Sequence, residues 1–154
     1  MQLQFNELIE NLAASLGIDG LVIDGGATAL EIDGMAVTIA YDDAESGVVL
    51  GGAIGDPPPE GAAEFSELAL RANSELLTTG KGGIAQNDET GAYTFIRRLQ
   101  LDRLDVAAFG EALQDFANRL ELLRKMLAAF VPAAEAAKEL QDGGQPMETG
   151  FMRV

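Results

Sequence analysis

The feature that most constrains the fold is a change of hydrophobic period between Tyr93 and Phe130. Residues 93–101 alternate, which is typical of a strand with Tyr93 and Phe95 on one face and Thr94 and Ile96 on the other. The period then changes to steps of four and three, which predicts one long amphipathic helix. Its stripe consists of Phe109, Leu113, Phe116, Leu120, Leu123, Leu127 and Phe130.

One residue at each end bounds this predicted helix. Asp105 precedes the stripe and is suited to cap the helix N-terminus, and Pro132 marks the end of the pattern. The stripe is explained either by a core helix that covers a sheet or by a coiled coil that builds a structural oligomer. We favour the core helix, because coiled coils usually sustain more heptads.

The same periodic patterns predict the remaining helices and strands. A first helix is expected over residues 3–16, and three strands follow in a meander with Asp33-Gly34 as a hairpin turn. A second helix spans about residues 61–79, and a two-stranded hairpin precedes the long helix. In the second helix Leu70 and Leu77 lie off the main stripe, which predicts a second packing partner such as another subunit. Strands grouped in meanders predict an α+β fold, a twisted antiparallel sheet covered by helices.

The net charge of the chain limits the kinds of partner that it can bind. The 154 residues fit one domain, and 25 acidic against 10 basic residues give a net charge of −15. Such a surface repels phosphate backbones and anionic membranes, so we expect neither nucleic acid nor a membrane as partner. A basic or amphipathic protein segment fits better. No apolar run is long enough to span a bilayer and no signal peptide begins the sequence, so we expect a soluble cytoplasmic protein.

Catalytic signals are sparse. The chain has no Cys and no His, which removes thiolate chemistry and the commonest general base and zinc ligand. Residues 79–83 and 42–47 superficially resemble phosphate and calcium loops, but their spacing fits turns instead. We therefore expect no metal, no cofactor and no enzymatic activity. The alternative is a small α+β enzyme that uses an Asp or Glu in a deep pocket.

Several segments, in their order and spacing, resemble class I type III secretion chaperones, the CesT/Tir-chaperone family. The resemblance covers about residues 5–127, and no single motif carries it. The matching segments are residues 30–33, 37–41, 48–54, 68–73, 79–83, 88–91, 99–104 and 109–123.

This resemblance implies a homodimer with the element order α-β-β-β-α-β-β-α, which we assign to a domain of residues 1–131. The Ala- and Glu-rich chain after Pro132 lies outside the resemblance and predicts a C-terminal tail, 132–154, that is partly helical or disordered. The resemblance implies no catalysis and no nucleotide. Such proteins bind the N-terminal chaperone-binding segment of an effector in the bacterial cytoplasm, keep it secretion-competent and present it to the secretion ATPase. The alternative within the family is a regulatory homologue, of the anti-anti-activator type, that binds a small regulator of secretion genes.

The resemblance also suggests site residues. Effector binding is expected on apolar positions of the first helix and the sheet: Phe5, Leu8, Leu12, Leu30, Ile32, Val37 and Ile39. The dimer interface is expected on the second helix and fourth strand: Phe65, Leu68, Ala72, Leu76, Ile84 and Gln86. In the tail, Phe151 and Met152 are unusual for a solvated end and suggest either docking on a groove or a disordered terminus.

Overall fold

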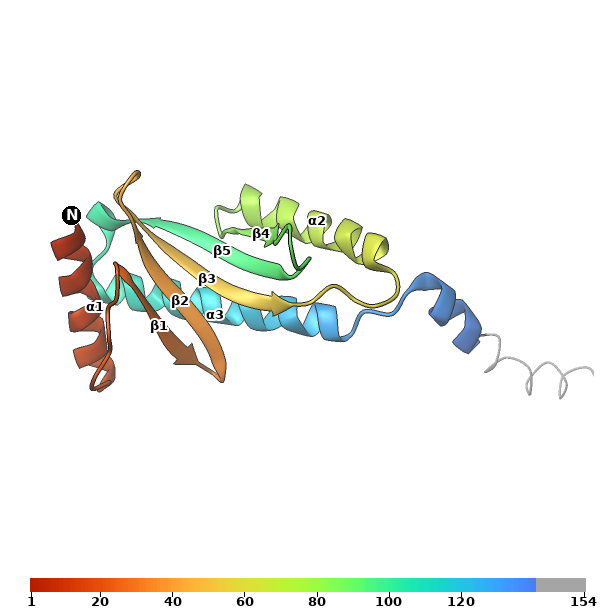
Figure 1. Ribbon diagram of the computed structural model, residues 1–154, viewed down its shortest axis with the longest axis horizontal. Helices are drawn as coiled ribbons and strands as arrows, with labels where there is room; N and C mark the ends of the chain where they lie inside the picture. The colour runs from red at the N-terminus through yellow and green to blue at the C-terminus, as the bar shows by residue number, and fades with distance from the viewer. Residues whose placement is uncertain (141–154) are drawn as a thin grey trace, which may run out of the picture.

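The computed structural model describes residues 1–140 (Figure 1), so the expectation for Phe151 and Met152 lies outside the described residues. The predicted order of helices and strands is confirmed. The elements are α1 (Gln2–Leu16), β1 (Ala27–Ile32), β2 (Met35–Asp42), β3 (Gly47–Gly55), α2 (Ala62–Thr78), β4 (Gly83–Gln86), β5 (Tyr93–Gln100), a short 3-10 turn η1 (Leu101–Arg103) and α3 (Val106–Ala128). None of the helices in this range is long and apolar enough to cross a membrane.

The strands form one antiparallel sheet in the order β1-β2-β3-β5-β4. The β1–β2 turn uses Asp33 and Gly34, both with positive φ (51° and 78°), which is the backbone that a tight, right-twisting hairpin requires. As a result β1 and β4 are the two edges of the sheet, and they lie on opposite sides of it in Figure 1.

The long helix α3 lies across one face of the sheet (Figure 1) and buries its stripe there. Phe109, Phe116 and Leu120 are fully buried, and Phe116 stacks on Phe95 of β5 with ring centroids 4.6 Å apart. Gly52 of β3 permits the close approach, because a Cβ at this position would clash with Leu120. Because the stripe is buried in the protomer's own core, it is not free to form a coiled coil with another chain, and the coiled-coil alternative is rejected.

The predicted cap at the start of α3 is confirmed. The Asp105 side chain accepts a hydrogen bond of 2.7 Å from the Ala108 N–H and so caps α3. At the other side of the core, α1 ends at Gly17 in the left-handed conformation, and Phe5 packs against Tyr41 of β2. The opposite face of the sheet carries small or polar residues, such as Ala36, Thr38 and Ala53, and is exposed.

The helix α2 lies beside β4, along one edge of the sheet (Figure 1). Phe65 packs edge-on against both Tyr93 and Phe130, with ring centroids 5.1 and 5.3 Å apart. The chain after α3 returns to this point: the Glu64 carboxylate accepts a hydrogen bond of 3.0 Å from the Ala133 N–H. Residues 133–140 are helical, so the described part of the tail begins with a helix fastened to the start of α2.

Candidate binding surfaces

The structure places the predicted effector-binding residues together, but mainly inside the protein. Six of the seven are buried in one hydrophobic core, and Ile32 is partly buried: Phe5, Leu8, Leu12, Leu30, Val37 and Ile39 form the buried set. Alternation and helical spacing show that these apolar residues share one face, and in the structure that face packs into the core. Their contact with an effector stays a prediction, and the free surface on the same elements belongs to other residues.

The predicted dimer residues divide in a similar way. Phe65 and Leu76 are buried in the protomer's own core, and Leu68, Ala72 and Ile84 are partly buried against it. Only Gln86 is exposed. Within α2 the exposed large apolar side chains are Leu70 and Leu77, at 67% and 64%, the two residues that lie off the predicted stripe.

The edge of β1 offers unpaired main-chain groups. The N–H and C=O of Ala27 both bond to Asp24, so they point away from β2. Because hydrogen-bonding direction alternates along a strand, Ala29 and Glu31 also point away from β2. Within residues 1–140 these two residues have no main-chain partner on that side. Two donors and two acceptors therefore lie open on this edge.

A groove of about 470 Å³ runs beside these open groups, between β1 and the loop after α1. Ile18, Leu21 and Leu30 supply apolar lining, and Asp19 and Glu31 supply carboxylates. Val22 also lines it and is 73% exposed. The Thr28 hydroxyl donates to the Val22 carbonyl at 2.9 Å and so fixes this end of the loop to the strand. The surface thus combines an edge strand, an apolar wall and acidic groups.

The charge of this region is one-sided. Residues 1–70, which form α1, β1, β2, β3 and the first half of α2, hold thirteen of the 25 acidic residues and no Lys or Arg. Among the ion pairs of the described residues, none involves Asp19, Asp24 or Glu31. The β1 edge therefore lies in a field of uncompensated negative charge.

The edge of β4 is built differently. Here the Asn73 side chain of α2 accepts a hydrogen bond of 2.8 Å from the Ile84 N–H. This contact occupies a donor on the outer side of the strand, so α2 partly closes the edge. The strand is also short, at 4 residues, which limits the main-chain groups that it can offer.

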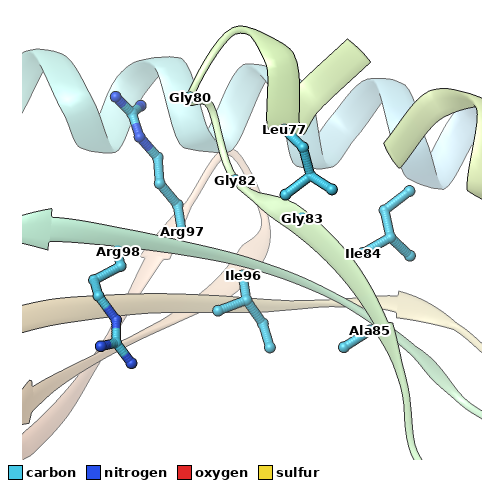
Figure 2. Close-up of a pocket in the computed structure, with 9 residues that line it drawn as sticks. All are labelled: Leu77, Gly80, Gly82, Gly83, Ile84, Ala85, Ile96, Arg97 and Arg98. Atoms are coloured by element: carbon cyan, nitrogen blue, oxygen red, sulfur yellow. The ribbon is translucent and has the colours of Figure 1, made fainter. Parts of the chain in front are cut away.

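The surface beside β4 is apolar and shallowly hollowed. One groove of about 420 Å³ is lined by Leu77, Ile84 and Ile96, and a smaller one of about 250 Å³ by Ala69, Leu70 and Ile84. Figure 2 shows Ile96 and Arg98 pointing to one side of β5, whereas Arg97 points to the other side, toward α3. Arg98 is held by Asp42 at 2.9 Å.

Arg97 belongs to a cluster centred on Asp115 of α3. Arg97, Arg119 and Lys81 approach the same carboxylate oxygen at 2.9, 3.2 and 3.7 Å. Partial burial works to raise the pKa of Asp115, but the Arg119 hydrogen bond and the positive charges of Arg119, Lys81 and Arg97 outweigh it and hold that pKa below its usual value. The cluster ties β5, α3 and the turn after α2 together.

Comparison with known proteins identifies this architecture. The model of the Tir chaperone protein (CesT) family matches residues 7–124. The chain therefore belongs to the Tir chaperone protein (CesT) family, as the resemblance in its sequence implies. None of the curated proteins compared with the chain matches it.

Solved structures share the fold at low sequence identity. A HopA1–SchA chaperone–effector complex is similar with a TM-score of 0.71 and 19% identity, covering 80% of this chain and 95% of that one. An ExsC–ExsE complex is similar with a TM-score of 0.71 and 17% identity, covering 87% and 98%. The Yersinia pestis type III secretion chaperone SycH, in complex with a fragment of YscM2, gives a TM-score of 0.61 and 17% identity, covering 77% and 98%.

Proposed function

We propose that this protein is a type III secretion chaperone that binds the N-terminal segment of an effector and keeps it secretion-competent. The observation that carries the proposal is the β1 edge, where Ala29 and Glu31 leave main-chain groups open beside an apolar groove. An extended segment binds such an edge by adding a strand, while the groove accepts alternate side chains. Family membership and the fold shared with a chaperone–effector complex support the same function.

The proposal includes a homodimer joined through the α2–β4 side. Leu70 and Leu77 are large apolar residues exposed on one helix, and Ile96, at 37%, lies on the neighbouring strand. Covering Leu70 or Leu77 contributes about 1–2 kcal/mol before the cost of association, and covering Ile96 contributes less. A second copy that presents the same surface is the partner that a twofold contact requires.

The setting of this function is the bacterial cytoplasm, where a chaperone meets its client before export. Presentation of the client to the secretion ATPase belongs to the same proposal. Both follow from the family resemblance, and the acidic surface, with a net charge of −15, supports them by keeping a protein with exposed apolar grooves soluble.

The test is affinity co-purification from the native cytoplasm. It compares the wild type with an Ala29→Pro variant, which is designed to lose the client. Proline removes the open N–H of Ala29, and an edge strand tolerates it because that N–H faces outward. Ala29→Val keeps the N–H and is the control. Proteolysis of the captured complex then locates the protected part of the client.

A secreted protein that is protected only near its N-terminus, and is lost with Ala29→Pro but not with Ala29→Val, is the expected result. Capture of a small transcriptional regulator would instead favour the regulatory homologue. A client that binds both variants equally would contradict strand addition at β1.

A further inference from the structure

We infer that the segment which pairs with β1 is cationic on one side: apolar residues alternate with Lys or Arg, and the basic residues face Glu31. This inference rests on the proposed function and specifies the chemistry of the partner. It follows from three features of the β1 edge, namely its open main-chain groups, the apolar wall of its groove and its uncompensated charge.

The main-chain groups fix where the segment lies. The open groups belong to Ala29 and Glu31, between the contact of Ala27 with Asp24 and the turn at Asp33. A strand that bonds to these groups lies in the groove between β1 and residues 18–22. Its side chains must then alternate between the two faces of the sheet.

The face that contains the core selects apolar side chains. On that side the segment meets Leu30, and the loop that closes the groove contributes Ile18 and Leu21. Ile18 is 37% exposed and Leu21 is partly buried, so both have apolar surface left to cover. Every second residue of the segment is therefore apolar.

The opposite face selects basic side chains. Ala29 and Glu31 point to this exposed face, and Ala29 is too small to compete for the space beside Glu31. Asp19 adds a second carboxylate to the lining of the groove, which contains no Lys or Arg. The cations nearest in sequence begin at Arg71, so nothing in α1, β1, β2 or β3 neutralises these groups. A Lys or Arg opposite Glu31 gains an opposite-charge cross-strand contact.

The α2–β4 side differs from the β1 edge in its charge. There Lys81, Arg97 and Arg119 accompany Asp115, and Arg98 accompanies Asp42. A cationic segment gains less at that surface, because these four cations already lie there and repel it. Charge therefore directs such a segment to β1 and away from the surface that joins two subunits.

The test uses synthetic peptides as probes of the full chain. One short peptide alternates valine and lysine, a second alternates valine and glutamate, and a third is the lysine peptide with its pairing amides N-methylated. The third keeps charge and side chains but removes the donors for strand addition. Affinity is measured by fluorescence anisotropy at low and high salt, and amide hydrogen exchange of Ala29 and Glu31 locates the site.

The lysine peptide is expected to bind about tenfold or more tightly than the glutamate peptide, to lose affinity with salt, and to protect the Ala29 and Glu31 amides. Glu31→Lys should reverse the preference. Glu89→Lys, an equal change of charge in the exposed β4–β5 turn, should leave it unchanged.

The two possible failures are distinct. Equal protection of the β1 amides by the lysine and glutamate peptides would overturn the charge inference and leave strand addition standing. Binding that survives N-methylation, or that Glu89→Lys weakens as much as Glu31→Lys does, would show nonspecific attraction and overturn the inference. A native client that leaves the β1 amides unprotected would overturn the proposed site itself.

Discussion

The two edges of the sheet, β1 and β4, are both antiparallel edge strands, but the residues around them differ in charge and in polarity. At β4 the Asn73 side chain occupies an outer N–H, and α2 adds Leu70 and Leu77 as an apolar surface. At β1 the outer groups of Ala29 and Glu31 stay open, and acidic side chains surround them. The difference indicates that one edge is suited to a flat, self-complementary contact and the other to an extended foreign segment.

The sharpest way to break this comparison uses two adjacent residues. Leu76 is 6% exposed and Leu77 is 64% exposed, although they follow each other on α2. Leu76→Asp places an unpaired charge in the core and should cost about 3–5 kcal/mol, a large part of a typical folding free energy. Urea unfolding followed by circular dichroism measures this loss. A Leu76→Asp protein as stable as the wild type would mean that α2 packs differently from the structure described.

The neighbouring change tests the proposed homodimer and should separate its subunits without unfolding them. Leu77→Asp combined with Leu70→Asp introduces charge on the exposed side of α2, so the dissociation constant of the dimer should rise about 100-fold or more. Light scattering after gel filtration gives the mass, and circular dichroism checks the helices. Leu122→Asp on α3, at 66% exposure, is the matched control and should stay dimeric. A double variant that remains dimeric would place the subunit contact elsewhere.

The reciprocal change at the other edge sharpens the comparison. Ala29→Pro should weaken client binding about tenfold, because one main-chain hydrogen bond is lost and the proline ring crowds the added strand. The dimer should be unaffected, since β1 lies at the far edge from β4. Titration of a fluorescent client segment and light scattering measure the two effects on one sample. Loss of the dimer in this variant would contradict the separation of the two surfaces.

The smallest expected effect concerns the charged cluster beside the β4 side. Because the folded protein holds the pKa of Asp115 below its ordinary value, the carboxylate stabilises the fold at neutral pH, and this contribution disappears as the pH falls through the lowered pKa. Asp115 is partly exposed, so Asp115→Asn should cost only about 1 kcal/mol at pH 7. The difference between wild type and variant should shrink as the pH falls below the ordinary carboxyl pKa of 3.8. A difference that is constant with pH would attribute the loss to packing or hydrogen bonding.

Sequence patterns predicted the elements well because the local signals agree with the tertiary structure. The change of period after Tyr93 located β5 and α3, and Asp33-Gly34 located the first hairpin. The resemblance to secretion chaperones is likewise confirmed by the family match. Where each local preference and the global fold agree, the pattern alone is sufficient.

The binding surfaces were harder to predict, because an apolar residue in a pattern serves the core or a partner equally well. Phe5, Val37 and Ile39 look like anchors in the sequence, but in the structure they are buried. Leu70 and Leu77 were detectable, since they break the stripe of α2. The open groups of Ala29 and Glu31 left no trace in side-chain identity, because they belong to the main chain and depend on which strand lies at the edge.

The contact between Glu64 and Ala133 has a consequence for the order of events during synthesis. The start of α2 is fastened by Phe130 and by the Ala133 N–H, which follow it by more than sixty positions in the chain. Nearly the whole described chain must therefore be synthesised before the start of α2 can make its final contacts. The β1 edge pairs only with β2, but its inward residue Leu30 lies in one core with residues of α3. Both the β1 edge and the α2 surface are therefore completed only near the end of synthesis.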